Sequence, residues 1–193
     1  MDELAEKAQK DPIIFRLEHL QDERAKDVVR KIREMTKDQK INENEGLGYG
    51  FSRYKNTAAY CAVAAKVLVE KDTGEVHLQQ MWSSIDAGEV INIDGIKNQT
   101  EGGMIQAASW TLKEEVIFDA DHITSRDWAS YPILRFNNIP RVEVEVINRP
   151  LENALGAGEA AQGPAAAAVA NAIYYASGKR VRELPILPRK LKS

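Results

Sequence analysis

The sequence predicts an α+β (mixed α/β) fold in which helices and strands form a single domain. Apolar residues recur at helical spacing near both ends of the chain, and the middle holds runs that alternate apolar and polar residues. The length of 193 residues also suits one large domain. We expect three segments: a helical lead-in over 1–40, a β-rich region with one helix over 46–150, and a loop, helix and tail over 151–193.

The composition is that of an ordinary globular protein, with 44% hydrophobic and 28% charged residues. The 26 Lys and Arg residues nearly balance the 29 Asp and Glu residues, so we expect no nucleic-acid partner. No apolar run approaches the roughly 20 residues that cross a bilayer, and the acidic start Met1–Leu4 is unlike a secretory signal. We therefore expect no membrane segment and a cytoplasmic location, with the periplasm left open.

The histidines and the single cysteine do not form a metal-binding pattern. His19, His77 and His122 lie far apart in the sequence, without the short spacing of a zinc motif. One cysteine, Cys61, can form neither an internal disulfide nor an iron–sulfur site. We expect no metal held by this chain's own side chains, and we interpret Cys61 as a small core residue rather than a reactive thiol.

Two helices are predicted in the first forty residues. Asp11-Pro12 starts one of them, because Asp caps a helix and Pro is tolerated at its first position. Asp22 starts the next, whose basic positions share one face: Arg24, Lys26, Arg30, Lys31 and Arg33. Such a face could bind an anion, although a solvated helix face is the commoner use of this pattern.

The segment Asn42–Gly50 is predicted to be a polar, glycine-rich joint. Its run Gly46-Leu47-Gly48-Tyr49-Gly50 is superficially similar to a dinucleotide-binding loop. That loop requires a hydrophobic strand before it and a helix after it, and neither pattern is present. We expect instead that these glycines let the backbone pass close to a neighbour.

A β-hairpin is the clearest local prediction. Apolar residues alternate from Cys61 to Val69, Asp72-Thr73-Gly74 supplies the turn, and Val76 begins the return strand. That strand ends at Asp86-Ala87-Gly88.

A helix is predicted to start near Asp94 and to place Gln99, Gly103 and Gln106 on one face. Its pair Gly102-Gly103 costs about 1 kcal/mol per residue against Ala, which indicates a close neighbour. Tight helix packing and the approach of a ligand explain the pair equally well.

Two further strands are predicted, over 115–119 and 142–147. The irregular stretch 128–140 between them is either functional or wraps the surface. An alanine-rich helix follows over 165–176 and ends at Gly178, and the proline-punctuated tail after it is predicted to be extended.

Glu159 is the only carboxylate in a run of small residues, Leu155-Gly-Ala-Gly-Glu-Ala-Ala-Gln-Gly-Pro164. The small neighbours leave room for a bulky group, so Glu159 could act on it as a general base. From the residues alone, a glutamate that complements the dipole of the following helix is the simpler interpretation. A phosphate loop is excluded because no P-loop lysine follows.

Four segments carry a resemblance to a known family. They are Asp11-Pro12 to Leu20; Tyr54-Lys-Asn-Thr-Ala-Ala-Tyr-Cys-Ala62; Asp86-Ala-Gly88 with Ile91-Asn92 and Gln99-Thr-Glu-Gly-Gly103; and Gly158-Glu-Ala-Ala-Gln-Gly-Pro164. In the same order, they resemble segments of the xanthine dehydrogenase/aldehyde oxidase family of molybdenum hydroxylases, the second of them as seen in bacterial members. Together they cover most of the chain.

The resemblance is to the C-terminal part of the molybdopterin-binding large subunit. It implies the second half of that subunit's molybdenum-cofactor-binding domain. The family's earlier glycine-rich cofactor loops, its iron–sulfur domains and its flavin domain have no counterpart here. We therefore interpret the chain as a fragment, a separately encoded half-subunit or a domain of a larger protein.

The resemblance also implies roles for particular residues. Glu159 corresponds to the catalytic general base, and Gln99 to the glutamine that hydrogen-bonds the pterin. Asn92 would contact the dinucleotide extension of the cofactor. The backbone of Gly156, Ala157 and Gly158 would lie against the cofactor near the metal, which the pterin rather than the protein holds.

The implied function is that of an oxidoreductase that hydroxylates an aldehyde or an N-heterocycle carbon with oxygen from water. Expected partners are the remaining half of the molybdenum subunit, iron–sulfur and electron-acceptor subunits with FAD or another acceptor, and a small substrate. The chain is expected to be inactive without the missing N-terminal half. The alternative is a non-catalytic assembly or scaffold module of such a complex.

Overall fold

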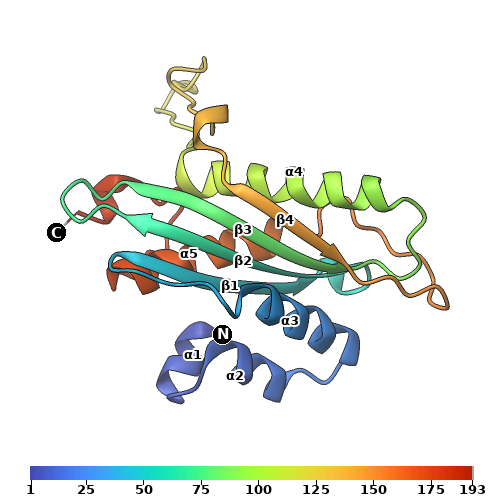
Figure 1. Cartoon of the computed structure of the whole chain (residues 1–193). Coiled ribbons are helices and arrows are strands. Elements are labelled where there is room, and N and C mark those ends of the chain that lie inside the picture. Colours follow the sequence, from blue (N-terminus) through green and yellow to red (C-terminus); the bar gives the residue numbers. More distant parts are fainter. Residues whose placement is uncertain (193) are drawn as a thin grey trace.

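A four-stranded sheet lies between two layers of helices in the computed structural model, which describes residues 1–192 (Figure 1). Its strands, in spatial order, are β1 (Glu45–Arg53), β2 (Tyr60–Val69), β3 (Val76–Asp86) and β4 (Arg141–Val146). The first three pair antiparallel, and β4 joins β3 in parallel. The mixed content of helices and strands confirms the predicted α+β class.

The described residues form five helices: α1 (Asp2–Lys7), α2 (Pro12–His19), α3 (Glu23–Thr36), α4 (Ile93–Leu112) and α5 (Gln162–Ser177). Helices α4 and α5 pack on one face, where alternate β2 residues such as Val63 and Val67 are buried with them. Helix α3 packs on the other face, over Trp82 of β3. Single 3-10 turns occur at Tyr54–Asn56, Phe136–Asn138 and Pro188–Lys190.

Local capping explains where the helices begin and end. The side chains of Asp11, Asp22 and Asn92 each accept a backbone N–H in the first turn of α2, α3 and α4, respectively. Gly178 ends α5 with a left-handed φ of +71°. These ends confirm the predicted helices, although α5 begins earlier than predicted, at Gln162.

The glycine-rich segment is a strand, so its prediction as a joint is wrong. Gly46, Gly48 and Gly50 alternate along β1 and therefore share one face. A methyl group on any of them would overlap the backbone of α5, at Pro164 in the case of Gly50. The glycines thus allow a helix to lie directly against the strand, which confirms the predicted close approach. Glycine disfavours strands, so its density concealed β1.

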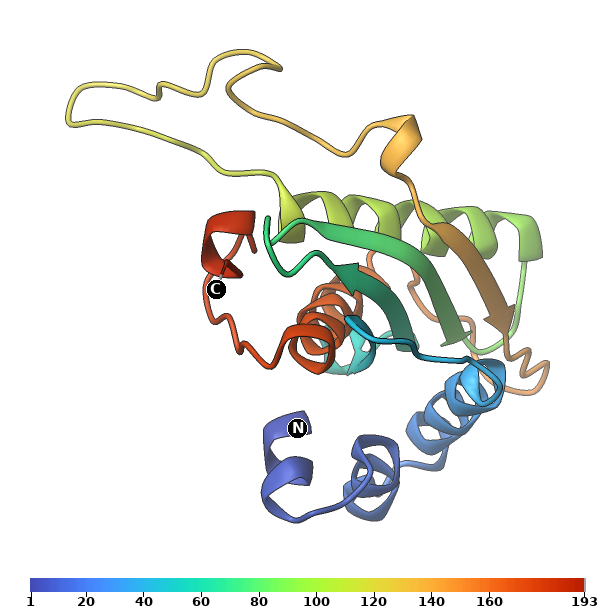
Figure 2. The same cartoon turned by 60° about the vertical axis from the view of Figure 1, so that its left-hand side comes forward.

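Residues 113–140, which we call the arm, leave the body between α4 and β4 and project outward (Figure 2). The predicted strand over 115–119 is wrong, because this part of the arm forms a single bridge, between Phe118 and Ile123. The arm does not wrap the surface, and several of its large apolar side chains are exposed: Phe118, Ile123, Trp128 and Phe136. The predicted strand over 142–147 is confirmed as β4.

The C-terminal tail is partly folded back rather than extended, because Ile186 and Leu191 are buried in the core. Cys61 is fully buried within β2, as predicted, and its Sγ lies 3.3 Å from the Ser83 hydroxyl. Burial raises the pKa of the Cys61 thiol to about 12. In the described part of the chain, no helix combines the length and apolarity that crossing a membrane requires.

Candidate functional site

A groove of about 330 Å³ lies where the connection from β3 to α4 meets the loop that leads to α5. Asn92 and Gln99 line it from the α4 side, and Ala157 and Gly158 line it from the loop. Gly156 and Glu159 immediately flank these two loop residues in the chain. Four of the six predicted site residues thus line this groove, and the other two are their direct neighbours in the chain.

Gln99 joins the two sides of the groove. Its Nε2 donates a hydrogen bond of 2.6 Å to the carbonyl oxygen of Gly158. Its side-chain oxygen has no partner among residues 1–192 and remains available to a ligand.

Asn92 has a structural role that its predicted function did not include. Its Oδ1 accepts the backbone N–H of Gly95 at 2.8 Å and so caps α4. The cap places the first turn of α4 at the groove. The amide nitrogen of Asn92 has no partner in the described residues and is available for the contact with a cofactor that the sequence predicts.

Glu159 lies in the turn that precedes α5, with its side chain exposed. Its backbone carbonyl accepts the N–H of Gln162 at 3.3 Å, so the carboxylate stands at the start of that helix. Its Oε2 accepts a hydrogen bond from the hydroxyl of Tyr54. Tyr54 is not among the predicted site residues, and its position in a segment that resembles the family was the one available signal.

Two glycines, Gly158 in the loop and Gly102 in α4, have open space beside them. A Cβ on Gly158 or on Gly102 would meet nothing within 4 Å. A Cβ on Gly103 would instead meet Ala161 and Gln162 of the α5 region, both at 3.6 Å. Gly103 therefore fits the interpretation of tight helix packing. Gly102 leaves open space, as the approach of a ligand would require.

A buried ionic cluster holds the wall of the groove. Asp86, at 0% exposure, accepts hydrogen bonds from Arg24, at 3.0 and 2.6 Å, from the Gly88 amide at 2.9 Å and from Arg149. Next to it, the N–H of Leu155 donates to the carbonyl of Ala87 at 2.8 Å, and both residues line the groove. The prediction of a solvated basic face is therefore wrong for Arg24.

The charge of Asp86 is stabilised by its partners. Burial by itself raises the pKa of this carboxyl group, but the hydrogen bonds from Arg24, the Gly88 amide and Arg149 outweigh it. The pKa of Asp86 is therefore below its usual value. The carboxylate stays ionised and keeps both guanidinium groups in place.

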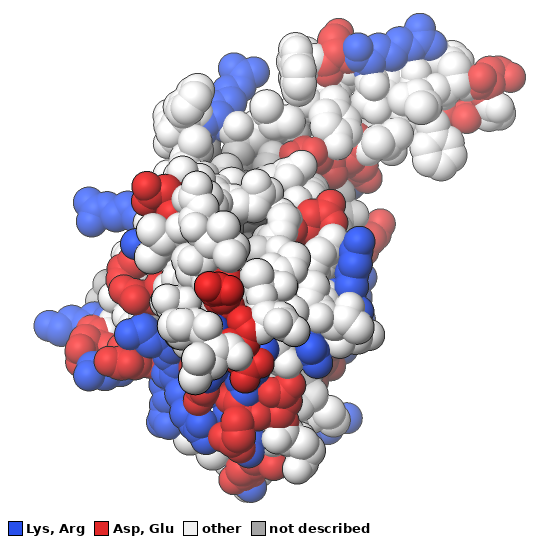
Figure 3. All heavy atoms as spheres, turned by 90° about the vertical axis from the view of Figure 1, so that its right-hand side faces the viewer, with Lys and Arg blue, Asp and Glu red and all other residues white. Residues whose placement is uncertain are grey.

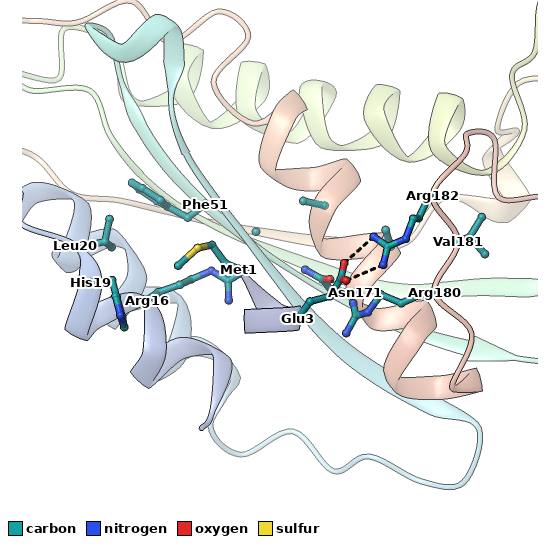
Figure 4. A pocket seen from close by; sticks show the side chains of 13 residues that line it. Met1, Glu3, Arg16, His19, Leu20, Phe51, Asn171, Arg180, Val181 and Arg182 are labelled. Atoms are coloured by element: carbon teal, nitrogen blue, oxygen red, sulfur yellow. Dashed lines mark hydrogen bonds and ion pairs between the residues drawn. The ribbon is translucent and has the colours of Figure 1, made fainter. Parts of the chain in front are cut away.

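A larger cavity, of about 570 Å³, lies between α1, α2, β1 and the end of α5 (Figure 4). Its charged side chains are already paired: Arg16 lies 2.5 Å from Asp2, and Arg182 lies 2.7 Å from Glu3. It contains none of the predicted site residues. The smaller groove is therefore the better candidate for the functional site.

The surface seen from one end of the sheet carries no extended patch of one charge (Figure 3). Acidic and basic side chains intermingle over its lower part, and uncharged atoms cover much of the body above them. Within residues 1–192, no three His, Cys, Asp or Glu side chains come together as a metal site.

Comparison with known proteins adds an independent observation. A family model described as "Molybdopterin cofactor-binding domain" matches residues 2–140. One subunit of the nicotinate dehydrogenase of Pseudomonas putida is 37% identical over 100% of this chain and 18% of its own length. The beta subunit of the isoquinoline 1-oxidoreductase of Brevundimonas diminuta is 29% identical over 97% of this chain and 24% of its own length.

Among solved structures, quinoline 2-oxidoreductase from Pseudomonas putida 86 matches 68% of this chain with a TM-score of 0.64 and 28% identity. The match covers 18% of that chain. The present chain thus spans less than a quarter of the length of these three proteins.

Proposed function

The chain belongs to the molybdopterin cofactor-binding domain family, and from this premise we propose that it forms the C-terminal part of the cofactor domain of a molybdenum hydroxylase. In this proposal Glu159 is the general base. The observation that carries the proposal is the groove that brings Gln99 and Gly158 together directly beside Glu159. The relatives named above are oxidoreductases by name, which supports an oxidoreductase complex.

The groove suits the ring system of a pterin. Amide side chains at Gln99 and Asn92 supply the donors and acceptors that a pterin edge requires. The small residues Ala157 and Gly158, with open space above Gly158, leave room for a flat ring. Among residues 1–192, those that line the groove include no Lys or Arg. Basic side chains that pair with the phosphates of a dinucleotide form would therefore lie outside this groove.

When bound, the molybdenum cofactor would supply the redox centre that accepts two electrons from the substrate. The contribution of this chain would be proton transfer and positioning. Because Oε2 of Glu159 is occupied by the Tyr54 hydroxyl, Oε1 is the atom that would take the proton. A positioned general base of this kind contributes about 10²–10⁴-fold in rate. Gln99 would hold both the cofactor edge and the turn that carries Glu159.

We propose an N-heterocycle as the substrate class in preference to an aldehyde. Three of the relatives are named for nicotinate, isoquinoline and quinoline, which are all N-heterocycles. The proposed partners are the rest of the molybdenum subunit and the iron–sulfur and electron-acceptor components, with FAD or another acceptor. Without them the chain would be inactive, since one side of the site would be missing.

The test is Glu159→Gln in the complex assembled with its co-expressed neighbours. We expect turnover to fall at least about 10²-fold while molybdenum, measured by elemental analysis, stays bound. Glu143→Gln, an exposed glutamate on β4, is the matched control and should leave turnover unchanged. Full turnover by the Glu159 variant would refute the role of general base.

The alternative of a non-catalytic assembly module is favoured by one observation, the exposed apolar side chains of the arm, such as Trp128 and Phe136. Such a surface is typical of attachment to another polypeptide. In that case the Glu159→Gln complex would form, bind molybdenum and turn over as the wild type does. The same experiment therefore separates the two functions.

A further inference from the structure

We propose that Tyr54 is a positioning residue for Glu159, a role that rests on the proposed function of Glu159 as general base. Tyr54 and Glu159 are 105 residues apart in the sequence, yet the Tyr54 hydroxyl donates a hydrogen bond to Oε2 of Glu159. No Lys, Arg or His within residues 1–192 forms an ion pair with Glu159. The Tyr54 hydroxyl is therefore the one side-chain group, in the described chain, that fixes this carboxylate.

Tyr54 is itself held firmly. It begins the connection between β1 and β2, and its backbone N–H donates to the carbonyl of Ala59 at 2.8 Å. Its own carbonyl accepts the N–H of Ala58 at 2.9 Å. The N–H of Ala59 in turn donates to the carbonyl of Gly156 at 3.1 Å. The connection is thus attached both to the sheet and to the loop that carries Glu159.

The backbone after Tyr54 adopts an unfavourable conformation. Lys55 and Asn56 are consecutive residues with φ values of +50° and +60°. Residues other than glycine rarely take such values, and each one costs of order 1 kcal/mol or more. Strain of this kind persists where the surrounding structure requires it, and it collects at functional sites. Here the strained turn directly follows Tyr54, whose hydroxyl contacts Glu159.

The geometry of the contact explains its value for a base. An exposed glutamate samples several rotamers, and only some would place an oxygen correctly for proton transfer. A hydrogen bond at Oε2 restricts these rotamers and leaves Oε1 unoccupied. Tyr174 offers a comparison: its hydroxyl donates to Glu6, but Arg180 also pairs with that glutamate, at 3.1 Å. Glu159 has no such second anchor in the described residues.

The experiment uses the assembled, molybdenum-loaded complex and the variant Tyr54→Phe, which removes only the hydroxyl. We expect kcat to fall about ten- to a hundred-fold while KM and molybdenum content stay at wild-type values. A purely structural loss would reduce the molybdenum content instead. Tyr174→Phe is the matched control, because it removes the same kind of Tyr–Glu bond away from the groove, and its kcat should not change.

A second measurement tests the contact without activity. In thermal unfolding of the chain, the losses of Tm in Tyr54→Phe and Glu159→Ala should not add in the double variant, because both remove the same bond. Additive losses would overturn the proposal. If Glu159→Gln abolishes turnover but Tyr54→Phe leaves kcat unchanged, this inference is overturned and the function of Glu159 stands. If Glu159→Gln keeps full turnover, both the proposed function and the positioning role fail.

Discussion

The amide nitrogen of Gln99 lies 2.6 Å from the carbonyl oxygen of Gly158, across 59 residues of sequence. This bond connects the first half of α4 to the turn before α5, so it joins the two sides of the groove. The same side chain would contact the cofactor with its remaining atoms. Gln99 therefore links the position of Glu159, the next residue after Gly158, to the position of the bound ring.

Gln99→Ala should lower the molybdenum content of the assembled complex, because it removes both the bond to Gly158 and the proposed contact with the pterin. The free energy of unfolding of the chain should fall by about 0.5–1.5 kcal/mol. Gln79→Ala is the control, because the Gln79 amide also makes a single hydrogen bond, of 3.0 Å to Glu45, away from the groove. Equal loss of molybdenum in the two variants would contradict the assignment of Gln99.

Gly48→Ala should destabilise the chain by about 1–3 kcal/mol or more, since the new methyl group would overlap the backbone of α5 at Ala168 and Ala172. Gly102→Ala should instead stabilise it by about 0.5–1 kcal/mol, because Gly102 lies in a helix interior with open space around it. Urea unfolding of the two variants measures the difference. Similar effects of both substitutions would show that β1 does not lie against α5 as described.

Asp86→Asn should reduce the free energy of unfolding by about 3–5 kcal/mol, because it leaves the guanidinium groups of Arg24 and Arg149 without the carboxylate between them. Glu23→Gln, which disrupts an exposed pair with Lys26 on α3, should change it by less than about 0.5 kcal/mol. Urea denaturation at neutral pH compares them. If Asp86→Asn left the free energy of unfolding unchanged, the cluster would not hold the groove wall.

The stability of the chain should depend on Glu45 at acidic pH. The backbone N–H of Asn42, with Gln79 and Lys66, lowers the pKa of Glu45 to about 2 against the opposing effect of burial. A carboxyl group whose pKa is lowered by folding stabilises the fold at pH values above its pKa in the unfolded chain, near 4.5. This contribution is lost as the pH falls toward 2. Glu45→Gln should therefore flatten the fall in stability over that range.

Thermal unfolding of the wild type and the Glu45 variant between pH 5 and about pH 2 gives the measurement. The Tm values of the two proteins should differ most above pH 4.5 and should become equal near pH 2. Parallel pH profiles would show that other carboxyl groups, not Glu45, control acid stability.

Local rules were sufficient for much of the fold. Asp11 and Asp22 cap helices where the sequence places caps, and Gly178 ends α5. The hairpin of β2 and β3 follows from alternation and a turn. Strand β1 could not be found in this way, because its glycines are explained only by the backbone of α5. The outward projection of the arm could not be predicted from local patterns either. Its apolar residues suggested a strand, but they form only a single bridge.

The site divides in a similar way. The family resemblance singles out Glu159, Gln99 and Asn92; the last two line one groove, and Glu159 directly follows Gly158, which also lines it. Tyr54 was missed because 105 residues separate it from Glu159, and no spacing rule predicts a contact over such a separation. The Arg24–Asp86 pair was missed for a related reason: a helix face that is charged throughout does not show which cation is buried.

The close packing of β1 on α5 also has a consequence for the order of events during translation. The side chain of Asn171 donates a hydrogen bond to the carbonyl of Tyr49, and 122 residues separate the two. β1 therefore leaves the ribosome long before the helix that covers it exists. We expect β1 to keep its glycine face uncovered until α5 has emerged, so that this part of the fold is completed late.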